Sequence, residues 1–189
     1  EGDATPDERV AALAAFGRAL TAIEAGHTPL EPPFPALAQA IRAHGLPLTP
    51  LRDLLSAFTQ DATVGRYATY ADVLDYCRRS ANPVGRLLLA LYGADDGADR
   101  DDSFARSDAV CTGLQLANFW QDVAVDWRKD RVYLPQEDLD RFGVPLAQIA
   151  EGRADARWRA LMLFETARAR TLLQRGHGLA RRLPWRLGL

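Results

Sequence analysis

The sequence predicts an all-α fold in a single domain that covers residues 1–189. Apolar residues recur at the three- and four-residue spacing of helices buried on one side, and no long stretch alternates apolar and polar residues as a strand would. Residues that begin and end helices stand at the ends of these stretches. With 48% apolar residues, a chain of this length can build one substantial core.

Two helices are predicted near the amino end. The segment 5–8, Thr-Pro-Asp-Glu, forms a capping box with proline at the first helical position. It opens an amphipathic helix that runs through about Glu24 and stops at Gly26. After a proline-rich connector, residues 35–44 predict a short helix that Gly45 closes, because glycine readily takes the left-handed conformation beyond a helix end.

The next helical stretch contains a proline. Thr49 and Pro50 begin a helix that runs to about Ala62, and Thr69 caps the helix after it. The pattern that follows Thr69 contains Pro83, which lacks a backbone donor and clashes with the preceding turn. The sequence therefore predicts a kink or a break at this proline.

Three further helices are predicted in the carboxyl half. The acidic, glycine-containing stretch 94–102 is typical of a loop. A helix with an unusual polar pattern covers roughly 103–126, and a loop at 127–134 follows it. A small helix is expected at 135–143 and a long last helix at about 153–182.

The helix predicted at 103–126 carries a polar stripe. Four polar residues follow one another at offsets of three, four and four, namely Gln115, Asn118, Asp122 and Asp126. On an α-helix this spacing places all four on one face. The other faces are apolar, with Leu114, Leu116, Phe119, Trp120, Val123 and Val125. We therefore expect a largely buried helix with one polar side.

The two aspartates of this stripe point to a bound cation. Carboxylates one turn apart repel one another by a few tenths of a kcal/mol in water, and by more when they are desolvated. Magnesium prefers hard oxygen ligands, usually one or two carboxylates completed by water and phosphate oxygens. Asp122 and Asp126 are thus predicted to bind Mg²⁺ together with a phosphate-bearing substrate, and Gln115 and Asn118 add neutral oxygen ligands on the same face. The alternative interpretation is a solvated acidic stripe.

Two residues that follow the stripe are candidates for substrate contacts. Arg131, in the loop after the helix, could bind diphosphate oxygens through two parallel hydrogen bonds. The alternative for Arg131 is an ordinary salt bridge to Glu137 or Asp138. Tyr133 is by itself more typical of a packing aromatic with a satisfied hydroxyl.

A second group of candidates precedes the proline break. Tyr76 and Ser80 lie one turn apart, and a break places neighbouring side chains where they can line a cavity. Among Arg78, Arg79 and Arg86 we expect one phosphate contact and two surface residues. Their spacing does not choose among the three.

Bulk composition excludes several classes of function. The net charge of −2 gives no general attraction to nucleic acid. The three histidines are scattered, which argues against a zinc site, and Cys77 and Cys111 are expected to be buried free thiols. No apolar run approaches 18 residues and no signal peptide is visible, so we expect a soluble, cytoplasmic bacterial protein without a transmembrane segment.

These motifs resemble those of the squalene/phytoene synthase family of all-α enzymes. Residues 115–126, followed by Arg131-Val-Tyr133-Leu-Pro135, are similar to its second aspartate-rich motif. Residues 76–85, Tyr-Cys-Arg-Arg-Ser-Ala-Asn-Pro-Val-Gly, are similar to its tyrosine-plus-Val-Gly motif. The resemblance covers most of the chain and implies an isoprenoid-synthase-type helical bundle around a central apolar cavity.

Within the family, the chain is most similar to the bacterial hydroxysqualene synthase branch of hopanoid biosynthesis. The similarity lies in Ser80-Ala-Asn-Pro-Val-Gly85 and Asn118-Phe-Trp-Gln-Asp122, where other branches usually carry an arginine in place of Gln121. The resemblance implies a Mg²⁺-dependent lyase or prenyltransferase that converts presqualene diphosphate and water to hydroxysqualene and diphosphate. The alternative within the family is a squalene or presqualene diphosphate synthase that uses farnesyl diphosphate.

The resemblance also assigns roles by position. The set that would face metal and diphosphate is Asn118, Asp122 and Asp126. The set that would contact substrate is Gln115, Asn118, Arg131 and Tyr133. Tyr76 would line the reaction centre as a catalytic residue beside the two aspartates. The expected partner is a prenyl diphosphate rather than nucleic acid, with peripheral membrane association for release of a lipid product.

One part of the family pattern is not found in the sequence. The first aspartate-rich motif is missing, and the chain begins at Glu1-Gly2-Asp3, where that motif normally has just ended. We therefore expect an internal fragment, truncated at both ends and inactive by itself. An alternative of another class is a non-catalytic respiratory-complex assembly factor of the same fold, which would not need Asp122 and Asp126.

Overall fold

The computed structural model describes residues 5–94, 99–181 and 183, and this part of the chain is helical. Its α-helices are α1 (Pro6–Glu24), α2 (Phe34–His44), α3 (Leu48–Asp61), α4 (Tyr70–Ser80), α5 (Asn82–Leu91), α6 (Arg100–Gln121), α7 (Val123–Arg128), α8 (Gln136–Phe142), α9 (Leu146–Ala150) and α10 (Ala156–Arg175). A short 3₁₀ helix, η1 (Leu179–Arg181), follows. The described residues contain no strand, only an isolated bridge between Arg66 and Val132, so the predicted all-α class is confirmed.

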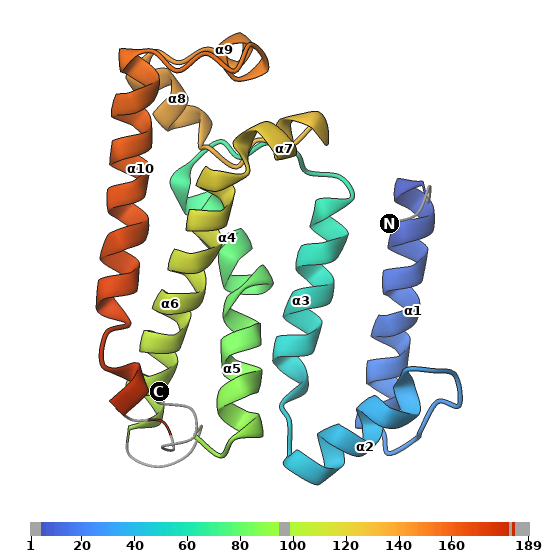
Figure 1. Cartoon of the computed structure of the whole chain (residues 1–189). Helices are drawn as coiled ribbons and strands as arrows, with labels where there is room; N and C mark the ends of the chain where they lie inside the picture. Colours follow the sequence, from blue (N-terminus) through green and yellow to red (C-terminus); the bar gives the residue numbers. More distant parts are fainter. Residues whose placement is uncertain (1–4, 95–98, 182, 184–189) are drawn as a thin grey trace.

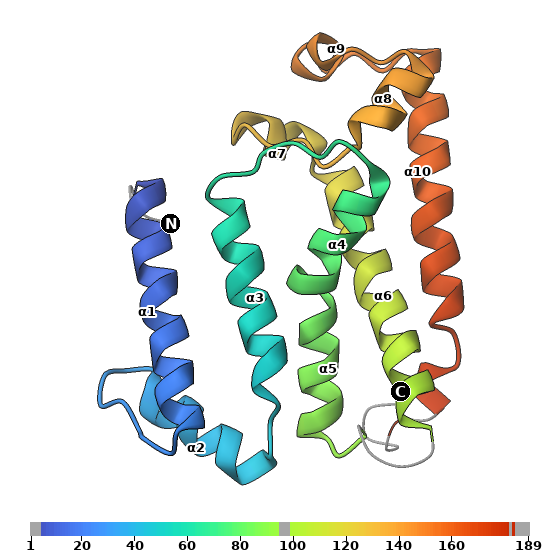
Figure 2. The same ribbon diagram turned by 180° about the vertical axis from the view of Figure 1, so that it is seen from behind.

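The long helices stand side by side with their axes roughly aligned (Figures 1 and 2). α6 packs against α10 on one side and α5 on the other, while α3 contacts α1, α4 and α5. The short helices α7, α8 and α9 gather at one end of the bundle, and α2 lies at the opposite end. None of the helices in the described residues is long and apolar enough to cross a membrane.

The predicted helix ends are confirmed where the sequence carries a cap. Thr5 and Thr69 each accept a hydrogen bond from the backbone of the third helical residue, and that residue's carboxylate bonds back. Gly45 and Gly143 end α2 and α8 in the left-handed conformation, with φ of 60° and 64°. These contacts satisfy backbone groups that a helix end leaves without partners.

Pro83 breaks the helix, as predicted. α4 ends at Ser80 and α5 begins at Asn82, where the Asn82 side chain accepts a hydrogen bond of 2.8 Å from the Thr112 hydroxyl of α6. One turn later Gly85 lets α5 approach α6 closely, because a Cβ there would lie 2.3 Å from the Ser107 hydroxyl oxygen. The break therefore seats α5 directly against the helix that carries the polar stripe.

The single helix predicted at 103–126 is wrong, because the structure divides it at Asp122. This residue has φ −97° and ψ 12°, and it ends α6 and precedes α7. A short aspartate favours helix ends over helix interiors, since its side chain competes with the backbone for hydrogen bonds. α6 also begins at Arg100, inside the predicted loop, of which residues 95–98 lie outside the described part.

The last long helix is shorter than predicted. α10 begins at Ala156, where the Asp155 side chain accepts a hydrogen bond from the Trp158 backbone, and it ends at Arg175 before a glycine. The single-turn helix α9 was not predicted, because five residues are too few to show a helical period. Cys77 is buried as expected, whereas Cys111 is partly exposed.

Candidate functional site

The polar stripe runs along the last turns of α6 and the first turn of α7. Asn118 and Asp122 are exposed, and Gln115 and Asp126 are half-buried. The expectation that the whole stripe lies in a buried environment is therefore only partly met. Within the described residues, the side chains of Asp122 and Asp126 form no salt bridge.

The bend at Asp122 keeps the two aspartates together. The Asp122 backbone N–H donates to the Asn118 carbonyl at 2.9 Å, and the Asp126 N–H donates to the Asp122 carbonyl at 2.8 Å. Four-residue hydrogen bonds therefore continue on both sides of the bend. As a result, Asp126 is still within the electrostatic reach of Asp122.

Without a bound cation, the ionised form of the Asp126 carboxyl is disfavoured. Burial raises the pKa of the Asp126 carboxyl, and the negative charge of Asp122 raises that pKa further. Lys129 and Arg131 lower it by a smaller amount. A cation between the aspartates would relieve this repulsion, which is the condition expected of a metal-binding pair.

The donor set fits part of a magnesium shell. Asp122, Asp126 and the Asn118 amide supply hard oxygens within two helical turns, and water and phosphate oxygens commonly complete such a shell. Among the described residues no group of three or more His, Cys, Asp or Glu side chains could by itself hold a metal. The arrangement therefore suits an ion that arrives with its phosphate ligand rather than a closed protein cage.

Buried aromatic rings pack beneath the stripe. Tyr133 stacks on Phe119 of α6 with ring centroids 3.7 Å apart and an interplanar angle of 4°. Tyr76 lies 5.8 Å from Tyr133, and Tyr67 lies 5.6 Å from it. The predicted residues Tyr76 and Tyr133 are thus brought together, with exposed fractions of only 4% and 7%.

Arg131 reaches this cluster from the loop after α7. Its Nη2 donates to the main-chain carbonyl of Asp61 at 2.9 Å, and its guanidinium interacts with the Tyr133 hydroxyl. The alternative salt bridge to Glu137 or Asp138 is not formed. Glu137 accepts the Tyr70 backbone N–H at 2.7 Å, and Asp138 pairs with an arginine of α10 at 2.6 Å.

Asp61, the last residue of α3, is a site residue that the sequence analysis missed. Burial raises the pKa of its carboxyl, while the Tyr76 hydroxyl and the Arg131 guanidinium act in the opposite direction. Its position offered one signal, since a carboxylate ends an otherwise amphipathic helix that packs against α4. No spacing rule links Asp61 to Tyr76 or Arg131, because the three residues meet only in the folded chain.

Two pockets adjoin Asp61 and Arg131. One has a volume of about 330 Å³ and is mainly apolar, with Arg9 and Phe58 among its lining residues. The other has a volume of about 220 Å³ and is polar, with Arg9 and Lys129 beside Arg131. Asp61 and Asp130 also line the polar pocket, so its basic residues outnumber its acidic ones by three to two, a small positive excess that suits an anionic substrate.

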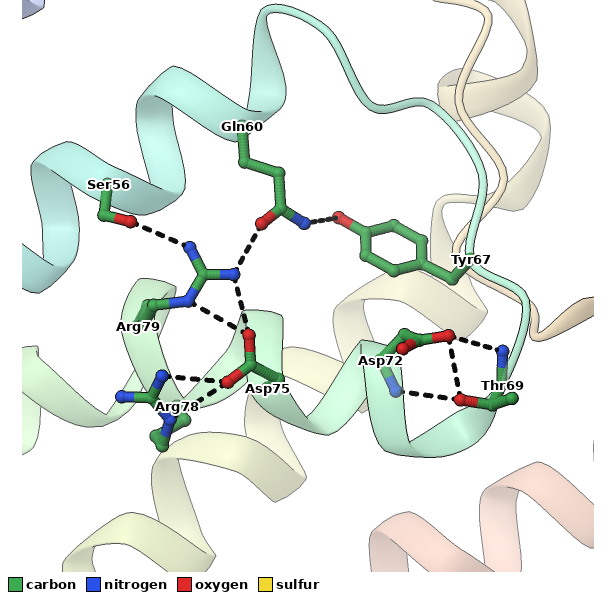
Figure 3. A network of polar contacts seen from close by, with 8 residues as sticks. All are labelled: Ser56, Gln60, Tyr67, Thr69, Asp72, Asp75, Arg78 and Arg79. Atoms are coloured by element: carbon green, nitrogen blue, oxygen red, sulfur yellow. Dashed lines mark hydrogen bonds and ion pairs between the residues drawn. The ribbon is translucent and has the colours of Figure 1, made fainter.

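The arginines that precede the proline break are already paired. Arg78 and Arg79 both bind Asp75 at 2.8 Å, and Arg79 also donates to Ser56 and Gln60 (Figure 3). Arg86 pairs with a carboxylate of α6, Asp108, at 2.6 Å. Each of the three arginines is thus held by a carboxylate in this structure, and none is singled out as a phosphate contact.

An apolar surface lies next to the stripe. On α5, Val84 and Leu88 are 48% and 50% exposed, and on α6 Leu114 is 53% exposed one turn before Asn118. α5 packs on α6 through Gly85, so helical geometry places these side chains on one open side of the helix pair. The polar stripe and these apolar side chains therefore lie on the same side of the helix pair.

Comparisons with known proteins point to one family. The sequence model of the squalene/phytoene synthase family matches residues 1–189. A hydroxysqualene synthase of Rhodopseudomonas palustris is 35% identical over 176 residues, which are 92% of this chain and 56% of that protein. A phytoene synthase of Arthrospira platensis is 36% identical over 169 residues, which are 83% of this chain and 54% of that protein.

Solved structures give the same result. A squalene synthase, HpnC, from Alicyclobacillus acidocaldarius superposes with a TM-score of 0.88 at 38% identity, covering 100% of this chain and 68% of that one. A dehydrosqualene synthase superposes with a TM-score of 0.83 at 26% identity, covering 92% and 60%. The chain spans little more than half the length of the curated relatives named above. With its helical bundle, its paired aspartates and these matches, the chain belongs to the squalene/phytoene synthase family.

Proposed function

We propose that this chain carries half of an active site that converts presqualene diphosphate and water, in the presence of Mg²⁺, to hydroxysqualene and diphosphate. The observation that carries the proposal is the shared face of α5 and α6. The carboxylates of Asp122 and Asp126 stand at one end, and the half-exposed apolar surface of Val84, Leu88 and Leu114 continues from them. A diphosphate joined to a long hydrocarbon has the same division into a polar head and an apolar tail.

The residues of the stripe would act on the leaving group. Asn118, Asp122 and Asp126 would hold Mg²⁺, which when bound neutralises charge on the departing diphosphate. Gln115 and Arg131 would contact diphosphate oxygens, and the basic residues Arg9 and Lys129 in the pocket beside Arg131 support this direction for the anion. Burying each methylene of the tail contributes about 0.8 kcal/mol, so the apolar surface would supply much of the binding free energy.

Tyr76 and Tyr133 would face the carbocation that remains after ionisation. Both are buried among aromatic rings, whose electron-rich faces stabilise nearby positive charge. Tyr133 also connects the two parts of the site, because its hydroxyl lies within the electrostatic reach of Asp61, Arg131 and Asp126.

A second candidate within the family is supported by the relatives themselves. The phytoene synthase of Arthrospira platensis is as similar to this chain as the hydroxysqualene synthase of Rhodopseudomonas palustris. A head-to-head condensation that starts from two prenyl diphosphates, such as farnesyl diphosphate, would use the same aspartates and the same apolar surface. The water-dependent reaction is preferred because the sequence around residues 80–85 and 118–122 resembles the hydroxysqualene branch.

Product analysis separates these candidates. Two proteins are compared: the 189-residue chain, and the protein expressed from the longest reading frame that contains its coding sequence. Each is incubated with Mg²⁺ and either presqualene diphosphate or farnesyl diphosphate, without a nicotinamide cofactor. The proposal predicts an alcohol from presqualene diphosphate, labelled in ¹⁸O-water. Presqualene diphosphate or a hydrocarbon formed from farnesyl diphosphate would support the second candidate. The assay of the 189-residue chain alone tests the expectation that it is inactive by itself.

Substitution of Asp122 distinguishes an enzyme from a scaffold. D122N should abolish turnover by orders of magnitude, since it removes one of two carboxylates that would hold the ion. D101N, at the exposed start of the same helix, removes the same charge and serves as the matched control. Equal activity of D122N and wild type, or no turnover of either diphosphate by any form of the protein, would refute the proposed function.

A further inference from the structure

We propose that Asp61 is the positioning residue for Tyr76, and that its carboxyl group fixes the direction in which the Tyr76 hydroxyl points. This inference rests on the proposed function for its catalytic consequence, because Tyr76 is the residue expected at the reaction centre. Its structural content does not depend on the substrate. Asp61 would act through Tyr76 and would not touch the reacting atoms.

The contact between the two side chains is the first observation. The Tyr76 hydroxyl interacts with the Asp61 carboxyl, and Tyr76 is only 4% exposed. A phenol beside a carboxylate donates its proton, since an ionised carboxylate can only accept. The hydroxyl of Tyr76 therefore has one preferred direction as long as the Asp61 carboxylate is present.

The second observation is that the Asp61 carboxyl is short of donors. Its Oδ1 is buried and has no hydrogen-bond partner among the residues that the structure describes. An unsatisfied buried oxygen is costly, so a carboxylate kept in this place calls for an explanation beyond fold stability. With so few competing donors, the interaction with Tyr76 carries more weight for Asp61 than it would on the protein surface.

The end of α3 holds two tyrosines of the cluster. Gln60, the residue before Asp61, donates from its Nε2 to the Tyr67 hydroxyl at 3.3 Å (Figure 3). The Oε1 of Gln60 is itself held by Arg79, which is anchored by Asp75. Neighbouring side chains on one helical turn thus fix two hydroxyls, one through an amide and one through a carboxylate.

The last turn of α3 is also bound by the loop after α7. Arg131 donates to the Asp61 main-chain carbonyl at 2.9 Å, so the loop after α7 is tied to the last residue of α3. The Asp61 carboxyl cannot follow the motions of a frayed helix end while this bond is in place. Asp61 therefore links two predicted site residues, Arg131 through its backbone and Tyr76 through its side chain.

The consequence for chemistry concerns the Tyr76 oxygen. When the phenol donates to a carboxylate, its oxygen becomes more negative and its lone pairs stay free on the other side. Such an oxygen is suited to stabilise positive charge that develops during ionisation of a prenyl diphosphate. Without Asp61 the hydroxyl can rotate, and the preorganisation of that oxygen is lost.

A spectroscopic experiment tests the positioning without any substrate. The five tyrosines are labelled with ¹³C at Cζ, whose chemical shift reports hydrogen bonding of the hydroxyl, and Y76F identifies the Tyr76 signal. In D61N the Tyr76 signal should move more than any other. The matched control is D53N, which removes a carboxylate two turns earlier on α3 and should leave the Tyr76 signal in place.

The outcomes of this experiment all decide the question. A Tyr76 signal that is unchanged in D61N overturns the inference. Should D61N fail to fold, D61E keeps the charge but lengthens the side chain, and it must likewise move the Tyr76 signal. An unmoved signal in folded D61E overturns the inference as well.

Kinetics of an active form test the catalytic consequence. D61N should lower kcat about tenfold to hundredfold, the range expected for loss of a hydrogen bond to a charged group, with little change in KM. D61E should recover part of the loss, and D53N should match wild type. Absence of turnover in the wild-type protein would refute the proposed function instead, and would leave the spectroscopic result to decide the role of Asp61.

Discussion

A buried carboxyl pair between α8 and α10 leads to a sharp prediction about pH. Glu165 is 0% exposed, and its Oε1 lies 3.1 Å from Nη1 of Arg168. Asp138 of α8 lies 2.6 Å from the same nitrogen. The other Glu165 oxygen, Oε2, is buried and has no hydrogen-bond partner within the described part of the chain. Two carboxyl groups therefore depend on one guanidinium, which is itself packed against the Tyr70 ring at 4.0 Å.

The arrangement keeps one proton on the pair at neutral pH. Burial raises the pKa of Glu165 to about 8, and the neighbouring Asp138 carboxyl contributes to the rise. The charge of Arg168 opposes the shift but cannot neutralise both carboxylates. Glu165 is thus expected to be a neutral acid in the folded protein and an ionised carboxylate in the unfolded chain.

The sign of the pH effect follows from proton linkage. Between the usual value of 4.5 and about 8, the folded state holds a proton that the unfolded state has released. The contribution of Glu165 to stability is therefore fully present at acid pH, and it is lost as the pH rises toward the folded pKa. At about 1.4 kcal/mol per pH unit, the loss of unfolding free energy over this window is at most about 5 kcal/mol.

The substitution E165Q should remove this dependence. Glutamine is neutral at every pH, so the free energy of unfolding of E165Q should fall less than that of wild type between pH 5.5 and 8.5, and E165Q should be the more stable protein at the upper end. Urea unfolding followed by circular dichroism measures both curves, with E31Q, an exposed site in the α1–α2 connector, as the control. Parallel pH profiles of wild type and E165Q would refute the reasoning.

Three further predictions concern the stripe, a cap and a helix contact. D122N should lower the pKa of Asp126, because the Asp122 charge helps to raise it, and ¹³C NMR of the Asp126 carboxyl measures the shift. T69A removes the side-chain cap of α4 and should cost about 1 kcal/mol in urea unfolding; full stability of T69A would contradict the capping role. G85A places a Cβ 2.3 Å from the Ser107 hydroxyl oxygen of α6 and should lower the free energy of unfolding by about 1–3 kcal/mol. In G17A the new Cβ has no neighbouring atom within 4 Å among the described residues, so this variant should stabilise α1 by up to about 1 kcal/mol.

Local chemistry explains which parts of the fold could be predicted. Thr5, Thr69, Gly45 and Gly143 act through the backbone groups next to them, so their effect is the same in a sequence as in the structure. Pro83 acts likewise on its own preceding turn. Asp122 is a weaker local marker, because an aspartate favours helix ends but is also tolerated in the middle of many helices.

Contacts between distant segments explain what the sequence could not show. The stripe and its neighbour Arg131 are close in sequence and were found there. Asp61 is separated by 70 positions from Arg131, to which its carbonyl binds, and no period or motif connects them. The alternative salt bridge of Arg131 is absent for the same reason, since Glu137 and Asp138, the first acidic residues after it in sequence, bind other groups.

The exposure of Asn118 and Asp122 calls for a choice between a solvated acidic stripe and a binding face. A solvated stripe would have aspartates with ordinary pKa values and polar neighbours. Here burial and Asp122 raise the pKa of Asp126, and the stripe continues into Leu114, which is 53% exposed. Half-exposed apolar side chains beside carboxylates that form no salt bridge among the described residues favour the binding face that we propose. The proposed prenyl diphosphate with its metal ion would cover both parts of this face, since it joins a cation-binding anion to a hydrocarbon.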